Sequence, residues 1–437
     1  MCAPLFQPAI IQSVLDLDVY KINMMQAAYR FYPQTQVRYE LIVRSDDNLS
    51  DLVEEVREEI NRLAELRFDA AQLAYLAEKA PYLTAEFLSY LETFRFHPQQ
   101  QVSVGIFRTA QGDCQLRVTI NGIWHETILY ETLVMSIISE LRNRRYWAQI
   151  PQSQLHKVLE DKLDFLDSEL KRRNITNFRF SEMGTRRRFS FAAQKTMLDV
   201  LRARVPELLL GTSNYHLAQE FNLTPIGTVA HEWTMAHQAL VAIQLSQRVA
   251  LDKWLEAFNG SLGIALTDTI GIDAFLSDFD LDKATAYAGV RHDSGSPFVW
   301  GDKIIAHYES LGIDPTTKAL IFTDGLDFAR ALDICEYFAG RAQISFGIGT
   351  FLANDMGNWT NDKGTRYQPI SMVVKMAECN GSPVAKISDE PEKAMCEDIF
   401  FLMNLKQRFG LEVDLDKAIE MLKQMKRQQK KRIQSVA

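Results

Sequence analysis

The chain has 437 residues, a formal net charge of −8, and 47% hydrophobic and 24% charged residues. This composition is typical of a globular protein with ample material for a core, and the negative charge argues against nucleic acid as the main partner. No apolar run approaches the length of a membrane span, and the first residues lack the basic and apolar regions of a secretory signal, so no membrane partner is expected. The five cysteines are widely spaced without a Cys-x-x-Cys pair, which favours a reducing, cytoplasmic location over a disulfide scaffold or a zinc knuckle.

Residues 1–150 predict an α/β module with no phosphate-binding loop of its own. Alternating apolar residues over 36–44 indicate a half-buried strand, and 102–107 with 114–120 indicate a β-hairpin. A helix is predicted after Asp16 and Asp18, since acidic residues suit a helix N-terminus. Further helices are predicted at 49–66, 70–80, 85–94, 131–147 and 152–172.

From residue 177 onward, a short apolar strand, a polar turn and a helix alternate about seven times. The predicted strands lie at 178–182, 208–210, 222–227, 262–266, 287–290, 319–322 and 342–346. Strands that alternate with helices imply right-handed crossovers and a parallel sheet. This many units in succession indicates an α/β fold with a closed or nearly closed (β/α) barrel over residues 151–365, whose polar turns collect at the C-terminal rim.

The segment 366–437 is predicted to return to the N-terminal module. Two apolar stretches, 372–377 and 384–387, indicate a strand pair, and 399–409 indicates a helix. They follow a polar, glycine-rich loop at 354–368. The tail over 416–432 has the pattern of an amphipathic helix with a basic, solvated end.

The most informative stretch is 227–233, Gly-Thr-Val-Ala-His-Glu-Trp. Its histidine, His231, follows a predicted strand and opens a long helical pattern that reaches Leu251. Free N–H groups at a helix N-terminus favour anions, so His231 could hold a phosphoryl group or carry one covalently. The alternative is a buried, hydrogen-bonded histidine beside a helix cap.

Two glycine-containing turns at predicted strand ends suit phosphate. Gly347 and Gly349 would let backbone N–H groups approach a phosphate, and Thr350 adds a hydroxyl donor. Thr323 opens a similar turn that ends at Gly325. Neither turn matches the dinucleotide fingerprint or a nucleotide P-loop.

Charged residues are predicted at the same rim. Arg186, Arg187 and Arg188 are consecutive guanidinium groups suited to phosphate or carboxylate, although we expect one or two of them to be structural. Arg291 and Asp293 lie two residues apart, so on an extended strand end they would face the same side. One cation beside one carboxylate suits a phosphorylated sugar.

Metal-dependent hydrolysis is the rival interpretation. A zinc peptidase requires His-Glu-x-x-His, but Met235 stands where the second histidine is needed. A metal-dependent barrel hydrolase could draw on His231, His237, Asp268 and His292. No His-x-His or similar ligand pair occurs on a predicted strand end, which disfavours it. Asp268 and Asp273 could reach Mg²⁺ or serve as helix caps.

Six motifs, in order and covering nearly the whole chain, together resemble the bacterial nicotinate phosphoribosyltransferase family, a group of type II phosphoribosyltransferases. They are Asp18-x-Tyr20-Lys21, Gly184-Thr-Arg-Arg-Arg-Phe, Gly211-Thr-Ser-Asn, Gly227-Thr-x-Ala-His-Glu-Trp, Arg291-His-Asp-Ser-Gly and Phe346-Gly-Ile-Gly-Thr. The resemblance implies synthesis of nicotinate mononucleotide and pyrophosphate from nicotinate and phosphoribosyl pyrophosphate. It also implies coupling to ATP hydrolysis through a transient phosphohistidine. Mg²⁺ is expected on the substrate pyrophosphate, with Asp268 as the candidate neighbour.

The resemblance assigns roles residue by residue. It makes His231 the phosphohistidine, stacks Tyr20 on the pyridine ring, and lets Thr228 and Arg291 bind nicotinate. The remaining ligand contacts that it implies are Asp18, Arg186, Ser213, Asp293 on the ribose, Thr323, and Gly347, Gly349 and Thr350 on the 5′-phosphate. It further implies an irregular α/β barrel, and a homodimer in which each subunit presents Tyr20 to the active site of its partner.

Two positions depart from the family pattern. Ser296 stands where close bacterial relatives are expected to have aspartate, which weakens a ligand role there. Ser213 stands where nicotinamide-using relatives have an acidic residue, and a neutral side chain there favours nicotinate. Nicotinamide phosphoribosyltransferase remains the alternative activity, and an inactive relative that binds metabolites is the alternative from another class.

Overall fold

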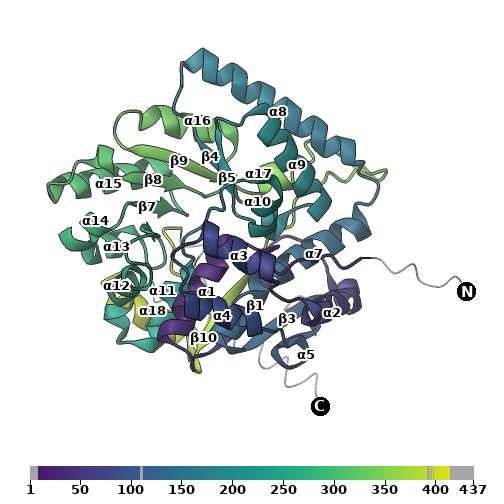
Figure 1. Ribbon diagram of the computed structural model, residues 1–437, viewed down its shortest axis with the longest axis horizontal. Helices are drawn as coiled ribbons and strands as arrows, with labels where there is room; N and C mark the ends of the chain where they lie inside the picture. The colour runs from purple at the N-terminus through teal and green to yellow at the C-terminus, as the bar shows by residue number, and fades with distance from the viewer. Residues whose placement is uncertain (1–7, 109–111, 391–393, 395, 397, 414–437) are drawn as a thin grey trace, which may run out of the picture.

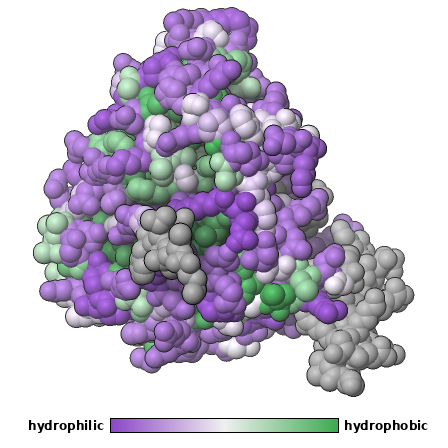
Figure 2. Space-filling view, turned by 90° about the vertical axis from the view of Figure 1, so that its right-hand side faces the viewer, coloured by the Kyte–Doolittle hydropathy of each residue, from purple (hydrophilic) through white to green (hydrophobic). Residues whose placement is uncertain are grey.

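Two sheets organise the computed structural model, which describes residues 8–108, 112–390, 394, 396 and 398–413 (Figure 1). One sheet is parallel and carries the second half of the chain, and the other is antiparallel and belongs to the N-terminal module. Buried apolar residues of both halves form one large continuous core. On the face shown in Figure 2, hydrophilic residues predominate and hydrophobic ones gather in small groups.

The parallel sheet has six strands in the order β5-β4-β9-β8-β7-β6. Their bounds are β4 Phe180–Glu182, β5 Leu209–Thr212, β6 Ile264–Leu266, β7 Gly289–His292, β8 Ala319–Phe322 and β9 Gln343–Ile348. The helices between and around them are α8 Gln152–Arg173, α9 Phe191–Arg204, α10 Tyr215–Phe221, α13 Ile272–Asp278, α14 Leu281–Ala286, α15 Pro297–Ser310, α16 Phe328–Tyr337 and α17 Thr350–Ala353. The strand–helix alternation predicted from the sequence is confirmed.

The strand predicted at 222–227 is wrong. This stretch makes a single bridge, between Thr212 and Pro225, and runs beside β5 as irregular chain. Proline has no N–H to donate to a ladder, so regular pairing cannot continue through Pro225. The described part of the chain therefore contributes six parallel strands, and irregular chain leads to His231 where the seventh strand was predicted.

The long helical pattern that begins at His231 also divides. It forms α11 (His231–Leu240), a 3₁₀ turn (Ile243–Leu245) and α12 (Ser246–Phe258), because Val241 takes an extended backbone conformation. The two helices pack side by side, with the rings of Trp233 and Trp254 5.6 Å apart. The apolar residues keep a helical spacing across the break because both helices face the same core, so the sequence pattern did not reveal it.

The antiparallel sheet has the order β11-β10-β1-β3-β2. Its strands are β1 Gln36–Val43, β2 Val102–Arg108, β3 Cys114–Ile123, β10 Met372–Cys379 and β11 Ser382–Pro383. The helices of this half are α1 Val19–Phe31, α2 Val53–Arg62, α3 Ala70–Lys79, α4 Ala85–Thr93, α5 Pro98–Gln101, α6 Trp124–Thr127 and α7 Tyr130–Tyr146. Near the end of the described chain, α18 (Ile399–Arg408) packs instead beside the 3₁₀ turn at Ile243–Leu245, with Leu405 against Ile270 and Ala274. Pairing of β10 with β1 confirms that the C-terminal segment returns to the N-terminal module.

The second strand of the predicted returning pair lies earlier than expected. Asn380 and Gly381 both have positive φ and close a tight turn directly after β10, so residues 382–383 form the pairing strand. Pro383 ends the ladder, and residues 384–387 then run towards the parallel strands, where Ile387 N–H donates to Thr269 O at 2.8 Å. The tail predicted as a helix at 416–432 lies outside the described residues.

Close approach of β7 and β8 generates the first prediction. A Cβ added at Gly289 would lie 2.1 Å from the carbonyl oxygen of Ala319, so Gly289→Ala should lower the free energy of unfolding by about 1–3 kcal/mol. Gly105→Ala on β2 is the matched control, because its Cβ would meet nothing within 4 Å, and should change that free energy by at most about 0.5 kcal/mol. Urea unfolding of both variants measures the difference, and equal losses would contradict the packing described.

Candidate active site

A cavity of about 680 Å³ opens where the parallel strands end and β10 crosses them. Of the binding and catalytic residues predicted from the sequence, its lining contains Asp18, Tyr20, Arg186, Ser213, His231, Arg291, Asp293, Thr323, Gly347, Gly349 and Thr350. The structure therefore brings together residues from the first helix, five strand ends and the start of α11.

Thr228 is the predicted contact that does not line the cavity. Its carbonyl oxygen lies 3.5 Å from Asn23 Nδ2, on the side of α1. Neighbouring Gly227 does line it, and a Cβ there would lie 2.8 Å from the backbone nitrogen of Tyr20. The glycine of this motif thus allows the loop before His231 to pass against the start of α1.

The two glycines before Thr350 have a packing role that the sequence did not indicate. A Cβ at Gly347 would lie 2.4 Å from Met183 Sδ, and one at Gly349 would lie 2.8 Å from the carbonyl oxygen of Met183. Both residues therefore let the end of β9 lie against the chain that leaves β4. Gly349 and Thr350 then begin α17 at the cavity wall.

His231 is the first residue of α11, which confirms its predicted place at a helix N-terminus. Its Nε2 lies 2.8 Å from Asp268 Oδ1 and 3.5 Å from Asp293 Oδ2. Burial and the nearby Lys386 charge lower the pKa of His231, against the opposing attraction of Asp268, so the imidazole is neutral near pH 7. With the proton on Nε2 and donated to Asp268, the lone pair of Nδ1 is left as a nucleophile.

Asp268 is buried, and both of its carboxylate oxygens contact polar partners. Ser294 Oγ donates to its Oδ2 at 2.6 Å, and Lys386 Nζ lies 2.7 Å from the same oxygen. Although burial opposes ionisation, the charges of His231 and Lys386 hold the pKa of Asp268 well below its usual range. Its carboxylate is therefore available to stabilise positive charge on the imidazole.

Mg²⁺ held directly by Asp268 does not fit this arrangement. His231, Asp268 and Asp293 could group their ligand atoms within 4.8 Å, but the Lys386 ammonium already lies 2.7 Å from Asp268 and 3.8 Å from Asp293. That ammonium occupies the place a bound cation would need. Asp273 lies elsewhere, on the exposed surface, in an ion pair with Lys303 at 2.6 Å.

The cavity wall also contains cations that sequence reasoning missed. Arg44 follows β1, Lys375 lies on β10, and Lys386 follows β11. Burial, with repulsion from Lys386 and Arg44, lowers the pKa of Lys375 to about 7. The sequence did offer one sign of them: each of the two apolar strands predicted in the C-terminal segment contains a single lysine.

The opposite end of the cavity carries an aromatic ring beside an arginine. The Arg186 guanidinium lies 5.5 Å from the centre of the Tyr20 ring, and its Nε lies 3.2 Å from Asp18 Oδ2. Asp18 is the N-cap residue of α1 but makes no capping bond, and instead accepts from Ser213 Oγ at 2.5 Å. Ser213 is itself neutral, but the Asp18 carboxylate lies directly beside it. Burial raises the pKa of Asp18, and the Arg186 charge opposes that shift.

Comparisons with known proteins agree with this geometry. Residues 178–413 match the model described as "Nicotinate phosphoribosyltransferase (NAPRTase) family", and residues 15–139 match its N-terminal domain. A curated nicotinate phosphoribosyltransferase of Vibrio vulnificus is 99% identical over 437 residues, with 100% of both chains covered. The chain belongs to the nicotinate phosphoribosyltransferase family.

Solved structures of the family have the same fold. A crystal structure of nicotinate phosphoribosyltransferase from Vibrio cholerae is 60% identical with a TM-score of 0.93, covering 96% of this chain and 98% of that one. One from Porphyromonas gingivalis is 32% identical with a TM-score of 0.83, covering 92% and 100%. Among the described residues, no helix combines the length and apolar character needed to cross a membrane.

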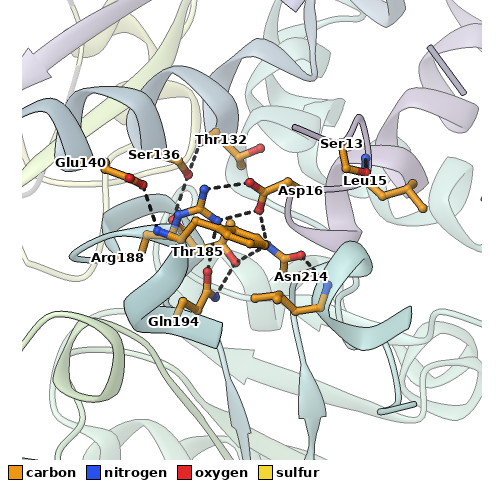
Figure 3. A network of polar contacts seen from close by, with 12 residues as sticks. Ser13, Leu15, Asp16, Thr132, Ser136, Glu140, Thr185, Arg188, Gln194 and Asn214 are labelled. Carbon is orange, nitrogen blue, oxygen red and sulfur yellow. Dashed lines mark hydrogen bonds and ion pairs between the residues drawn. The ribbon is translucent and has the colours of Figure 1, made fainter. Parts of the chain in front are cut away.

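Within the family fold, a buried ion pair fixes the aromatic end of the cavity (Figure 3). Both nitrogens of the Arg188 fork contact Asp16, at 2.6 and 2.7 Å, and both side chains are almost completely buried. Asn214 Nδ2 also donates to Asp16, at 2.8 Å. This confirms that at least one of the three consecutive arginines is structural.

The expectation that a partner subunit presents Tyr20 stays a prediction, and the structure shows where the chain's own Tyr20 lies. Tyr20 and Asp18 line the cavity of their own chain, where Tyr20 OH lies 3.4 Å from Glu131 Oε1. The N-terminal module folds back on the parallel sheet because α1 is buried along most of its length between them. One chain therefore supplies both the aromatic end and the His231 end.

The Asp16–Arg188 pair generates the second prediction. Arg188→Met leaves a buried carboxylate without its partner, so we expect a loss of about 3–5 kcal/mol in the free energy of unfolding. Adding Asp16→Asn to this variant should recover part of the loss, since the unpaired charge is removed. Urea unfolding tests this, with Arg202→Met as the control: it breaks an exposed pair with Asp199 and should leave stability nearly unchanged.

Proposed function

We propose that the chain synthesises nicotinate mononucleotide and pyrophosphate from nicotinate and phosphoribosyl pyrophosphate, coupled to ATP hydrolysis through phosphorylated His231. The relatives named above supply the substrate class. The observation that carries the ATP-coupled step is the position of the His231 ring at the start of α11, where its Nε2 lies 2.8 Å from the buried Asp268 carboxylate and Nδ1 is left for attack. Burial lowers the pKa of this imidazole, which favours its neutral form. It shares one cavity with Tyr20 and Arg186.

In the phosphorylation step, the His231 Nδ1 lone pair attacks the γ-phosphorus of ATP. The N–P bond forms, the bond from that phosphorus to the β–γ bridging oxygen breaks, and ADP leaves with the electron pair. The Nε2 proton stays in place, and Asp268 stabilises the positive charge that the ring gains. Water later cleaves the N–P bond, which returns the neutral imidazole and inorganic phosphate.

In the transfer step, pyrophosphate departs from the ribose with the electron pair of the C–O bond, and the pyridine nitrogen attacks the oxocarbenium-like carbon. Arg44, Arg187 and Lys375 line the wall where negative charge would collect on the leaving group. Mg²⁺ bound with the substrate pyrophosphate adds further neutralisation. Little acid–base chemistry is required of the protein.

The ribose phosphate is assigned to the strand ends. Asp293 would accept from a ribose hydroxyl, and Thr323 Oγ1 holds it in place by a contact of 2.9 Å with its Oδ1. Gly347, Gly349 and Thr350 would bind the 5′-phosphate at the start of α17.

Nicotinate is assigned to the aromatic end. Tyr20 would stack on the pyridine ring, and Arg186 and Arg291 would hold its carboxylate. Arg291 suits this role because its Nε is buried without a hydrogen-bond partner in the described structure. Nicotinamide carries no charge for these two arginines, so a substrate panel of nicotinate, nicotinamide and quinolinate, each with and without ATP, decides between the activities.

Assembly and location follow from the same features. Because Tyr20 and His231 line one cavity of the same chain, we propose that each chain of a homodimer, where formed, would use its own Tyr20. Cys114, Cys335 and Cys379 form no disulfide, which supports a reducing, cytoplasmic location.

The third prediction concerns the phosphate acceptor. His231→Asn should abolish ATP hydrolysis and incorporation of labelled phosphate, yet leave slow ATP-independent synthesis, because the nicotinate and ribose contacts remain. Labelling in acid-labile, base-stable form is measured after incubation with γ-labelled ATP. Undiminished labelling of the variant would place the acceptor at another residue.

The fourth prediction concerns shared sites. Tyr20→Ala and Arg291→Ala should each be nearly inactive, and mixing them under conditions of subunit exchange should restore no activity, since both residues serve the same chain. If partners shared sites, random mixing would instead restore roughly a quarter of wild-type activity. Mass spectrometry of the mixture provides the control for exchange.

A further inference from the structure

A chain of largely buried charges joins α1, α7 and α11 at the wall of the cavity. The ammonium of Lys21, on α1, contacts the carboxylates of Glu131, on α7, and Glu232, on α11, and the Lys21 side chain has no exposed surface. Glu232 Oε1 also accepts from Trp124 Nε1 at 2.9 Å and from Tyr39 OH at 3.0 Å. The first turn of α11 is therefore bonded to three separate elements of the N-terminal module.

Both ends of this chain reach the active site. Glu232 follows His231 directly, while the His231 ring bonds in another direction, to Asp268. At the far end, Glu131 lies 3.4 Å from Tyr20 OH and 3.8 Å from Arg186 Nη1. The phosphate acceptor and the aromatic end are thus joined through side chains that are almost entirely buried.

Phosphorylation would disturb the near end of the chain. A phosphoryl group on Nδ1 adds about −1.5 to −2 charges, on the ring whose Nε2 contacts Asp268 and Asp293 and at the positive end of α11. Repulsion from the carboxylates and attraction to the helix terminus both act on the first turn of α11. Since Glu232 lies in that turn, its contact with Lys21 must respond.

Lys21 divides one positive charge between two carboxylates, so a weaker contact with Glu232 strengthens its hold on Glu131. A change at Glu131 acts directly on Tyr20 and Arg186, the residues assigned to nicotinate. We propose that Glu232 and Lys21 are positioning residues that transmit phosphorylation of His231 to the nicotinate end of the cavity through Glu131. The proposal rests on the proposed function, in which His231 is phosphorylated.

The test uses Glu232→Gln, which keeps an oxygen for Trp124 and Tyr39 but removes the charge that faces Lys21. The variant should still take up labelled phosphate from ATP. The ratio of nicotinate KM without ATP to that with ATP should shrink by at least about fivefold, and less nicotinate mononucleotide should form per ATP hydrolysed. A merely structural role would lower kcat under both conditions and leave this ratio unchanged.

Glu131→Gln, at the cavity wall, carries the same test if Glu232→Gln does not fold. Where both fold, their effects on the KM ratio should be non-additive in the double variant, because each breaks the same chain. The matched control is Arg142→Met, which removes another ion pair of α7, with Asp47 at 2.7 Å, and should keep the wild-type ratio.

The outcomes separate the two proposals. Wild-type protein that takes up no phosphate would overturn the proposed function, and this inference with it. Normal phosphate uptake by wild type and variants, with an unchanged KM ratio in Glu232→Gln and Glu131→Gln, would overturn the inference alone.

Discussion

The Asp16–Arg188 ion pair is the constraint on which the aromatic end of the active site depends. Each of its main members lies one or two residues from a residue of the cavity: Asp16 from Asp18, Arg188 from Arg186, and Asn214 from Ser213. Three chain segments far apart in sequence are therefore fixed by one buried cluster. Breaking a buried pair leaves a charge without solvation, so the segments cannot drift apart at low cost.

Charge is divided in a consistent way around the cavity. Carboxylates that hold other protein groups, such as Asp268, Glu131 and Glu232, are buried behind the wall or in it, and each has a cation beside it. Lys375 is in the opposite situation, because it is a buried cation close to other cations, and its pKa is lowered for that reason. Anionic phosphates would relieve that repulsion, which suits substrates that carry several negative charges.

Local chemistry made much of the site predictable. Gly-Thr and Arg-His-Asp are short sequences at strand ends, so the placing of His231, Arg291 and Asp293 in one cavity could be predicted from spacing and family resemblance. Glu131, Lys375 and Lys386 could not, because their roles arise only when β10 and α7 close over the parallel strands. Lys21 was within a recognised motif, but its burial between two carboxylates depends on three helices meeting.

The fold was predictable to a similar degree. Alternation of strands and helices indicated the parallel sheet, yet the number of strands was overestimated, since the apolar residues before Gly227 pack without a ladder. The place of Tyr20 in the cavity of its own chain also could not be predicted from spacing. It depends on how α1 docks, which is a matter of core packing and not of local pattern.

The pairing of β1 with β10 has a consequence for synthesis of the chain. Leu41 pairs with Val374, so the inner edge of β1 stays without its neighbour until most of the polypeptide has left the ribosome. Contacts so distant in sequence are slow to form, and an unpaired strand edge invites association with other chains. A polypeptide released early would lack β10 and the residues that follow it, so unfinished chains would have neither the complete antiparallel sheet nor Lys375 and Lys386, two of the cations of the cavity.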